Sequence, residues 1–400
     1  MKNRYRIMTI ILVLLLLGSL TACGAGPAAS GDDHSDWAGV RDSITYGTLT
    51  DTGFYYVDVY RLSYFDFAAN TSAVLCHKPG CLHEDNQCDA YLFGMSNRPM
   101  YFYNNRLYYV DSYEPTLYSR NAIGMELTKI ATLGTKYLEE QKVVQIRSGA
   151  IAGGYLYYEA SVSAVTVDEN GDNTRMVERD YIGRVNLSTG KDEILIEEVY
   201  DNQYEKLILC AARENGVLLS RLEGMEDMDS KDPAFVETAA KSPVTLEYWN
   251  GETGETTVLF RKTRRECIGI AKLFNGKVYF KISGSMQSED RGCTYSYDLN
   301  TGKEEKACPY YTNYQLCGSY TLCYDAENKE MLYDMATGKT LPCELDKSVY
   351  VYNVSNKGCV IGYSIYEEDG SRKERRFYYV TLDSLADGLQ EADLQYMYTF

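Results

Sequence analysis

Short apolar and aromatic segments alternate with polar turns along most of the chain, and one such unit recurs. Each copy has a turn with Gly or Asn, an aromatic strand, a second strand, a tight Thr-Gly turn and a last strand. Aromatic and β-branched residues suit half-buried, pleated strands. The aromatic strand of the unit is found at seven places: GFYYVD from Gly53, NRLYYVD from Asn105, GYLYYEA from Gly154, GVLLSRL from Gly216, GKVYFKI from Gly276, and more weakly SYTLCYD from Ser319 and GCVIGYS from Gly358.

The Thr-Gly turn is the second marker of the unit. It occurs as NLSTGK ending at Lys191, NGETGE ending at Glu255, NTGK ending at Lys303 and MATGK ending at Lys339. Asn, Thr and Gly supply a tight reversal and a positive φ at low steric cost. The two markers together predict consecutive β-hairpins in each unit.

The spacing of the units predicts the fold class. Successive aromatic strands start 39–62 residues apart, and repeats of this length with several short strands are typical of propeller blades. We therefore predict an all-β chain in which residues 43–400 form a β-propeller of seven blades. Six or eight blades are alternatives, and a tandem of β-sandwiches is the competing fold. The segment 394–398 is expected to complete a blade with the early strand 43–50 and so close the ring.

The composition agrees with a β-rich chain that has little helix. Tyrosine is the outlier, with 38 residues against 11 Phe and 2 Trp. Only the short stretches 135–143 and 383–389 are compatible with helical turns. Several strands contain adjacent tyrosines, such as Tyr55-Tyr56. Because neighbouring residues of a strand point to opposite faces, we expect one ring of each pair between blades and the other exposed or half-buried.

The first residues of the chain have the organisation of a signal peptide. Three basic residues precede an apolar run over 7–17, which is shorter than the roughly 20 residues that a membrane span needs. The segment ends in Leu20-Thr21-Ala22-Cys23, which resembles the bacterial lipobox. The resemblance implies cleavage of a lipoprotein signal peptide, residues 1–22, and a diacylglyceryl group on the Cys23 thiol. The alternatives are an ordinary secretory signal with a chance cysteine, or an N-terminal anchor helix.

This interpretation places the protein outside the cytoplasm, lipid-anchored at the cell membrane, because two acyl chains are enough for stable anchoring. Residues 23–42 comprise the lipidated cysteine and a small, polar stretch that is predicted to be a flexible tether. The formal net charge is −17, and removal of the basic signal peptide makes it more negative. Such an acidic surface argues against nucleic acid as a partner and against adsorption to anionic lipid headgroups.

A cluster of cysteine and histidine is the clearest candidate site. The segment 76–90 reads CHKPGCLHEDNQCDA and contains three of the 12 cysteines and two of the three histidines. Three thiolates and one imidazole form a closed tetrahedral set, as in structural zinc sites. A disulfide between two of these cysteines is the alternative, since disulfides form outside the cytoplasm, and bare thiols are the third possibility. We predict a structural zinc ion held by Cys76, Cys81, His83 and Cys88.

The same segment is similar to a pattern found in the first blade of Gram-positive propeller lipoproteins, Cys-x-Lys-Pro-x-Cys-x-His-x4-Cys-x-Ala. It is matched by Cys76, Lys78, Pro79, Cys81, His83, Cys88 and Ala90. With the blade markers, the chain resembles the TolB-like and YVTN-like β-propeller lipoproteins of Gram-positive cell envelopes over nearly its whole mature length. The resemblance implies a fold and a location, and it implies no particular activity.

Catalytic motifs are missing from the sequence. There is no Gly-x-Ser-x-Gly elbow, no His-Glu-x-x-His motif and no phosphate-binding loop. We predict a monomeric, membrane-anchored binding or scaffold module that docks a protein, a peptide or an envelope glycan on one face of the propeller. The alternative is a carboxylate-dependent enzyme acting on glycans or polyanionic polymers at the propeller axis. That enzyme would require acidic residues with perturbed pKa values to converge there.

Overall fold

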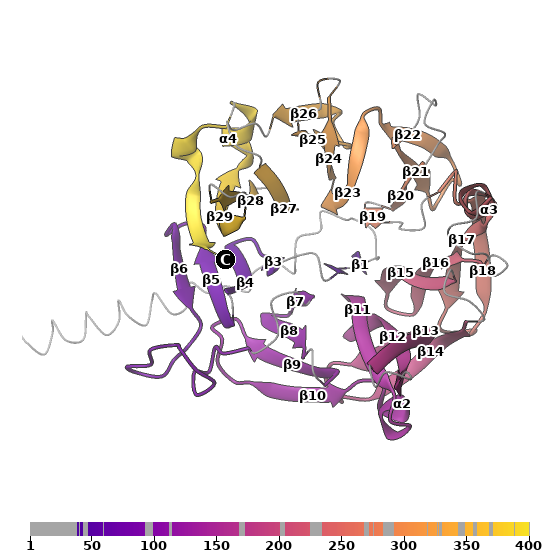
Figure 1. The fold of residues 1–400 in the computed structure, drawn as a ribbon, viewed down its shortest axis with the longest axis horizontal. Coiled ribbons are helices and arrows are strands. Elements are labelled where there is room, and N and C mark those ends of the chain that lie inside the picture. The colour runs from indigo at the N-terminus through magenta and orange to yellow at the C-terminus, as the bar shows by residue number, and fades with distance from the viewer. Residues whose placement is uncertain are drawn as a thin grey trace, which may run out of the picture.

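The chain folds into a seven-bladed β-propeller (Figure 1). The computed structural model describes residues 38–39, 41–42, 47–58, 60–92, 99–111, 114–167, 173–200, 205–224, 234–267, 272–274, 276–282, 292–317, 319–325, 327, 330–342, 349–354, 358–367, 371–387 and 389–399. The described strands form seven antiparallel sheets, which follow one another around a ring. The all-β fold and the seven blades predicted from the repeat spacing are therefore confirmed.

Each blade is built from four strands that are consecutive in the sequence. Blade 1 contains β3 (Gly47–Leu49), β4 (Gly53–Asp58), β5 (Arg61–Asp66) and β6 (Thr71–Val74). Blade 2 contains β7 (Met100–Tyr103), β8 (Arg106–Val110), β9 (Thr116–Asn121) and β10 (Thr128–Thr132). Blade 3 contains β11 (Val143–Ala152), β12 (Tyr155–Val167), β13 (Asn173–Asn186) and β14 (Asp192–Val199). Blade 4 contains β15 (Lys206–Arg213), β16 (Gly216–Leu222), β17 (Pro243–Asn250) and β18 (Thr256–Thr263).

The second part of the ring repeats this plan. Blade 5 contains β19 (Lys272–Phe274), β20 (Lys277–Lys281), β21 (Thr294–Asp298) and β22 (Glu304–Cys308). Blade 6 contains β23 (Tyr311–Cys317), β24 (Tyr320–Tyr324), β25 (Glu330–Asp334) and β26 (Lys339–Pro342). Blade 7 contains β27 (Val349–Val354), β28 (Gly358–Tyr366), β29 (Arg372–Thr381) and β30 (Gln395–Thr399). Of these four strands, the first lies nearest the axis and the fourth lies outermost in each blade (Figure 1).

The seven aromatic segments seen in the sequence form the second strand of the seven blades, from β4 in blade 1 to β28 in blade 7. Their tyrosine pairs are buried on both sides. Tyr55 and Tyr56 are 4% and 1% exposed, and Tyr157 and Tyr158 are fully buried. The expectation that one ring of each pair would be exposed is wrong, because every blade has a neighbour against each of its two faces. Apolar clusters accordingly fill the spaces between adjacent blades.

The Thr-Gly turns join the third strand to the fourth in blades 3 to 6. Their glycines all have positive φ, a conformation that a side chain would strain. The values are 71° at Gly190, 74° at Gly254, 68° at Gly302 and 73° at Gly338. This second sequence marker is therefore confirmed together with its physical cause.

The ring closes by side-chain packing, and the predicted pairing of segment 394–398 with strand 43–50 is wrong. β30 pairs with β29 of its own blade, and β3 pairs with β4. Blades 7 and 1 meet through an apolar cluster in which Tyr56 and Tyr398 stack. The hydroxyl of Ser72 also donates a hydrogen bond of 3.0 Å to the carbonyl oxygen of Met397. Each terminal blade already has four strands, so it needs no strand from the other end of the chain.

Two short strands from the N-terminal segment lie at the axis of the ring. β1 (Ala38–Gly39) adds to the inner edge of blade 4 by pairing with β15, and β2 (Arg41–Asp42) adds to the inner edge of blade 3 by pairing with β11. Figure 1 shows β1 in the middle of the propeller. The last residues of the segment 23–42, predicted as a tether, are thus joined to the propeller by backbone pairing.

Helix is confined, in the described part of the chain, to α2 (Thr135–Glu139), α3 (Phe235–Lys241), α4 (Leu382–Ala386) and the 3-10 turn η1 (Glu391–Asp393). The first and third of these fall in the two stretches for which the sequence allowed helical turns. Among the described residues, no helix has the length and apolarity to cross a membrane. The predicted signal peptide 1–22 and the lipidation site Cys23 lie outside the described residues.

Candidate metal centre

The cysteine–histidine cluster lies on a loop that leaves blade 1 after β6 and folds back onto β5. The backbone N–H of Leu62 donates to the carbonyl oxygen of Ala90 at 2.8 Å. The N–H of Leu92 donates to the oxygen of Tyr60 at 2.5 Å. Arg61 and Tyr91 form an isolated antiparallel β-bridge between these two bonds. The far end of the loop is therefore attached to blade 1 as an extra edge segment.

The structure brings all four predicted ligands together. The sulfur atoms of the three cysteines and a ring nitrogen of His83 lie within 4.8 Å of one another. His83 Nδ1 lies 3.3 Å from the sulfur of Cys88. Zinc binds sulfur at about 2.3 Å and imidazole nitrogen at about 2.0–2.1 Å, so ligand atoms of a tetrahedral site are separated by somewhat less than 4 Å. The donor set and its spacing fit one tetrahedral metal ion.

Tight turns place the four ligands. The N–H of Cys81 bonds to the oxygen of Lys78 at 3.2 Å, and Gly80 has φ of 72° within this turn. His83 has φ of 60°, a left-handed conformation that His adopts more readily than most residues with a side chain. The N–H of Cys88 bonds to the oxygen of Asp85 at 3.1 Å. The loop thus reverses direction before each of its later ligands.

The ligands differ in their burial, and the pKa values of Cys88 and Cys76 are shifted in opposite directions. Cys88 is 3% exposed and belongs to the core between blades 1 and 2, whereas the other three ligands are half-buried. Burial raises the pKa of Cys88 to about 11. Burial also acts to raise the pKa of Cys76, but the backbone N–H groups of Lys78 and Asp89 outweigh it and lower that pKa. A divalent cation would displace the thiol protons of such a cluster, because only the thiolate is a metal ligand.

An ion-pair network braces the loop from outside. The Lys78 ammonium lies 2.8 Å from one carboxylate oxygen of Asp89, and His77 Nδ1 lies 3.1 Å from the other. The hydrogen bond from Lys78 lowers the pKa of the Asp89 carboxyl. Lys78 also donates to the carbonyl oxygen of Gln87. His77 therefore braces the loop through Asp89 and lies outside the ligand set, as the sequence pattern implied.

The three cysteines of the loop are free thiols in the structure, so none of the three possible disulfides among them is formed. The loop ends where Cys88 and Ala90 enter the apolar core with Leu62. Every position of a four-ligand metal ion at this place would be filled by protein, which is the arrangement of structural sites and leaves none for a reacting water. The cluster can therefore fasten the loop to blade 1.

A second polar constellation, which sequence analysis did not identify, joins blades 3 and 4. Glu159 on β12 is 5% exposed and Asp180 on β13 is fully buried. Arg147 contacts both, at 3.6 Å from Glu159 and 2.8 Å from Asp180. Glu159 accepts the backbone N–H of Leu209 in blade 4 at 3.1 Å. Burial raises the pKa of Glu159, against the lowering effect of Arg147 and Leu209.

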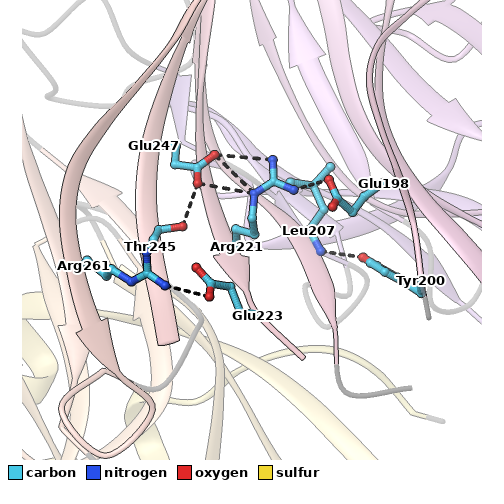
Figure 2. A network of polar contacts seen from close by, with 8 residues as sticks. All are labelled: Glu198, Tyr200, Leu207, Arg221, Glu223, Thr245, Glu247 and Arg261. Atoms are coloured by element: carbon cyan, nitrogen blue, oxygen red, sulfur yellow. Dashed lines mark hydrogen bonds and ion pairs between the residues drawn. The ribbon is translucent and has the colours of Figure 1, made fainter. Parts of the chain in front are cut away.

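The outer part of the same blade interface contains a second arginine-centred network (Figure 2). Arg221 on β16 contacts Glu198 of blade 3 and lies 3.3 Å from Glu247 of its own blade. Glu247 also accepts a hydrogen bond of 2.7 Å from the Thr245 hydroxyl. Nearby, the Tyr200 hydroxyl accepts the N–H of Leu207 at 2.6 Å, which again links blade 3 to blade 4.

These carboxylates serve the contact between blades. Each buried one among them is engaged by an arginine together with a backbone N–H or a hydroxyl, which are the partners that a buried carboxylate needs. They are spread from the inner to the outer strands, and the innermost position of blades 3 and 4 is taken by β1 and β2. The sequence gave no signal for them, since a glutamate in an alternating strand has the same pattern whether it faces water or a neighbouring blade.

The chain matches no protein-family model. It also matches no curated protein.

Comparison of structures finds β-propellers. The chain is similar to Pyrococcus horikoshii acylaminoacyl peptidase, with 9% identity and a TM-score of 0.51 over 88% of this chain and 54% of that one. Oligogalacturonate lyase from Vibrio parahaemolyticus matches at 12% identity and a TM-score of 0.43, over 70% and 73% of the two chains. TolB from Acinetobacter baumannii matches at 13% identity and a TM-score of 0.35, over 84% and 76%. At these identities the likeness concerns the propeller fold alone.

Proposed function

We propose that this protein is a lipid-anchored, extracytoplasmic propeller that acts as a binding or scaffold module, and that the Cys76, Cys81, His83 and Cys88 cluster holds a structural zinc ion. The main support is the position of β1 and β2 at the axis, where the N-terminal segment pairs with the inner strands of blades 3 and 4. A propeller whose axis is occupied by its own chain offers its faces and its loops for binding.

The zinc assignment is supported by the composition of the cluster. Three thiolates and an imidazole are soft and borderline ligands that suit zinc, whereas magnesium, calcium and manganese prefer oxygen. The cluster joins a loop to the edge of blade 1, and the Lys78–Asp89 ion pair lies beside it. A closed site of this kind contributes folding free energy to the segment that carries it.

Anchoring is supported by the sequence of the first 23 residues. Ala38, the first described residue, lies only 15 positions after Cys23. A chain of this length spans at most about 50 Å when fully extended. Lipidation at Cys23 would therefore keep the propeller within about its own diameter of the membrane, where envelope polymers and membrane proteins are the available partners.

The enzyme alternative has less support. Its carboxylates were expected to converge at the axis, and the buried carboxylates of blades 3 and 4 are each held by arginine. Activity on a glycan polymer is nevertheless measurable in the same assay as binding, because cleavage of glycosidic bonds releases reducing ends.

The test uses the purified full-length chain and insoluble peptidoglycan sacculi. Co-sedimentation without release of reducing ends would support a binding module, and release of reducing ends would favour the enzyme. In parallel, the native chain and a Cys23→Ala variant are expressed in a bacterial host that processes lipoproteins. We expect the native chain in the membrane fraction, accessible to external protease, and the variant in the soluble extracytoplasmic fraction. Retention of the variant in membranes would contradict lipid anchoring.

A further inference from the structure

Two buried cysteines meet between blades 5 and 6. Cys308 is the last residue of β22, the outermost strand of blade 5, and Cys323 lies on β24, the second strand of blade 6. Their thiols are in hydrogen-bond contact with each other. They belong to a set of six described cysteines outside the metal-centre loop, each no more than 2% exposed: Cys210, Cys267, Cys293, Cys308, Cys323 and Cys359.

The strand registers explain why these two thiols meet. Thr294 of β21 lies opposite Cys308, and Thr312 of β23 lies opposite Cys323. Directly opposed residues of antiparallel strands point to the same face of their sheet. The hydroxyl groups of Thr294 and Thr312 lie 2.9 Å apart, so both of these faces point into the interface between blades 5 and 6. Cys308 and Cys323 each lie one strand further from the axis than the threonine opposite them, and they therefore face each other across the same interface.

The surroundings of the pair favour disulfide chemistry. The hydrogen bond from the Cys323 thiol lowers the pKa of Cys308, although burial acts to raise it. A lower pKa increases the fraction of thiolate, which is the form that attacks a disulfide. In the part of the chain that the structure describes, the metal centre is the one group of three or more possible metal ligands. The Cys308–Cys323 pair therefore lacks the ligands of a second metal site.

We propose that Cys308 and Cys323 form a disulfide bond across the interface of blades 5 and 6. The oxidant is a disulfide of another molecule, either a thiol–disulfide oxidoreductase or glutathione disulfide. The Cys308 thiolate attacks one sulfur of the oxidant, whose S–S bond breaks, and a mixed disulfide forms. Cys323 then attacks the Cys308 sulfur and the mixed S–S bond breaks. The two cysteines lose two electrons and two protons, and the oxidant becomes two thiols.

The two cysteines are completely buried, so we expect the exchange to take place before blade 6 has packed on blade 5. The proposed location outside the cytoplasm would supply such an oxidant during folding. The new bond would close a loop of residues 308–323, which contains the whole of β23, the innermost strand of blade 6. Closure of this loop would stabilise the fold by restricting the unfolded chain.

The test is disulfide mapping of the full-length chain, produced in the same lipoprotein-processing host and alkylated at lysis to block its thiols. Peptides of a non-reducing digest are analysed by mass spectrometry before and after reduction. We expect a linked pair of peptides that contains Cys308 and Cys323 and separates on reduction. Cys293→Ala is the matched control, because it removes another buried cysteine, directly before β21 of blade 5, and should keep the linked peptides.

The outcomes separate the disulfide from the proposed location. Protein that is accessible to external protease, but has both cysteines alkylated or has either linked to a different cysteine, would overturn the disulfide. Protein that external protease does not reach would reject the location instead. In that case the purified chain is unfolded in urea, reduced, and refolded with zinc and glutathione disulfide. Formation of the Cys308–Cys323 bond then supports the disulfide, and its absence from the refolded chain overturns it.

A second measurement is the dependence of stability on reduction of the chain. We expect reduction to lower the urea midpoint of the native chain by about 1 M. Cys308→Ala and Cys323→Ala should lack this dependence, whereas Cys293→Ala should keep it. An equal effect of the reductant on the native chain and on all three variants would overturn the proposed bond.

Discussion

The ring of Tyr56 in the first blade stacks on the ring of Tyr398 in the last, with centroids 4.3 Å apart and planes inclined by 13°. Phe377 of the last blade also stacks on Tyr398, with ring centroids 4.4 Å apart. No hydrogen-bonded strand is shared between blades 1 and 7 in the described structure, so these rings and the cluster around them carry the closure of the propeller. An aromatic pair contributes about 0.5–1.5 kcal/mol beyond the burial of its area.

Removal of the Tyr398 ring should open the seam. Tyr398 is 4% exposed, and Tyr398→Ala leaves a cavity between the terminal blades. We expect a loss of about 3–5 kcal/mol in the free energy of unfolding, as for other buried aromatic residues replaced by alanine. Urea titration followed by tyrosine fluorescence measures it. Tyr396→Ala, two residues away and 53% exposed, is the control and should cost less than about 1 kcal/mol. Equal effects of the two changes would contradict closure by Tyr398.

Substitution of the two histidines distinguishes a metal ligand from a neighbouring residue that does not bind the metal. His83→Asn should abolish binding of one zinc ion per chain, because it removes the imidazole from the cluster. His77→Asn should retain the metal, because His77 contacts Asp89 and belongs to no ligand position. Elemental analysis of protein purified under reducing conditions provides the measurement. Zinc that survives His83→Asn, or is lost on His77→Asn, would contradict the assigned set.

Two arginines in the same region should differ in their contribution to stability. Arg221→Met leaves Glu198 and the nearly buried Glu247 without their cation (Figure 2). We expect a loss of about 1–3 kcal/mol. Arg261→Met removes the solvent-exposed pair with Glu223 and should cost no more than about 1 kcal/mol. Urea titration of both variants measures the two losses in the free energy of unfolding. A larger loss for Arg261→Met than for Arg221→Met would contradict a stabilising role of the Arg221 network between blades 3 and 4.

The pKa shift of Glu159 predicts how the stability of the folded protein changes with pH. Burial raises its pKa in the folded protein. A carboxyl group with a raised folded-state pKa binds its proton more tightly when folded, so it favours folding as the pH falls through that pKa toward the unfolded value of about 4.3. Glu159→Gln keeps an oxygen for the Leu209 N–H and cannot titrate. Relative to this variant, the native chain should gain stability as the pH is lowered from about 7 to about 5. Parallel pH curves of the two proteins would exclude the effect.

The architecture could be predicted because its markers are local. An aromatic segment marks the second strand of every blade, and a Thr-Gly turn with a positive φ joins the third strand to the fourth in blades 3 to 6. The innermost strands lack such a marker. β19 has only three residues and β7 has four, and neither was recognised. The metal cluster was predictable for the same reason, since its ligands lie within 13 residues of one another.

Features that depend on contacts between distant blades could not be predicted. Nothing near Glu159 in the sequence indicates that Leu209 will need its carboxylate, and nothing near Tyr398 indicates that Tyr56 will stack on it. The strand partner proposed for segment 394–398 was wrong for the same reason. Strand periodicity shows that a segment pairs, and the geometry of the whole ring decides with which neighbour.

The two axial strands, β1 and β2, give the folding of this protein an unusual order. Every other described strand finds its partners within its own blade, so each blade is complete soon after its residues have emerged. β1 and β2 emerge first, but their partners are Ala211, Ala212, Ser148 and Gly149. At about 5–20 residues per second, the N-terminal segment waits roughly 10–35 s for β15 to be made. β1 can therefore pair only when about half of the propeller has been made.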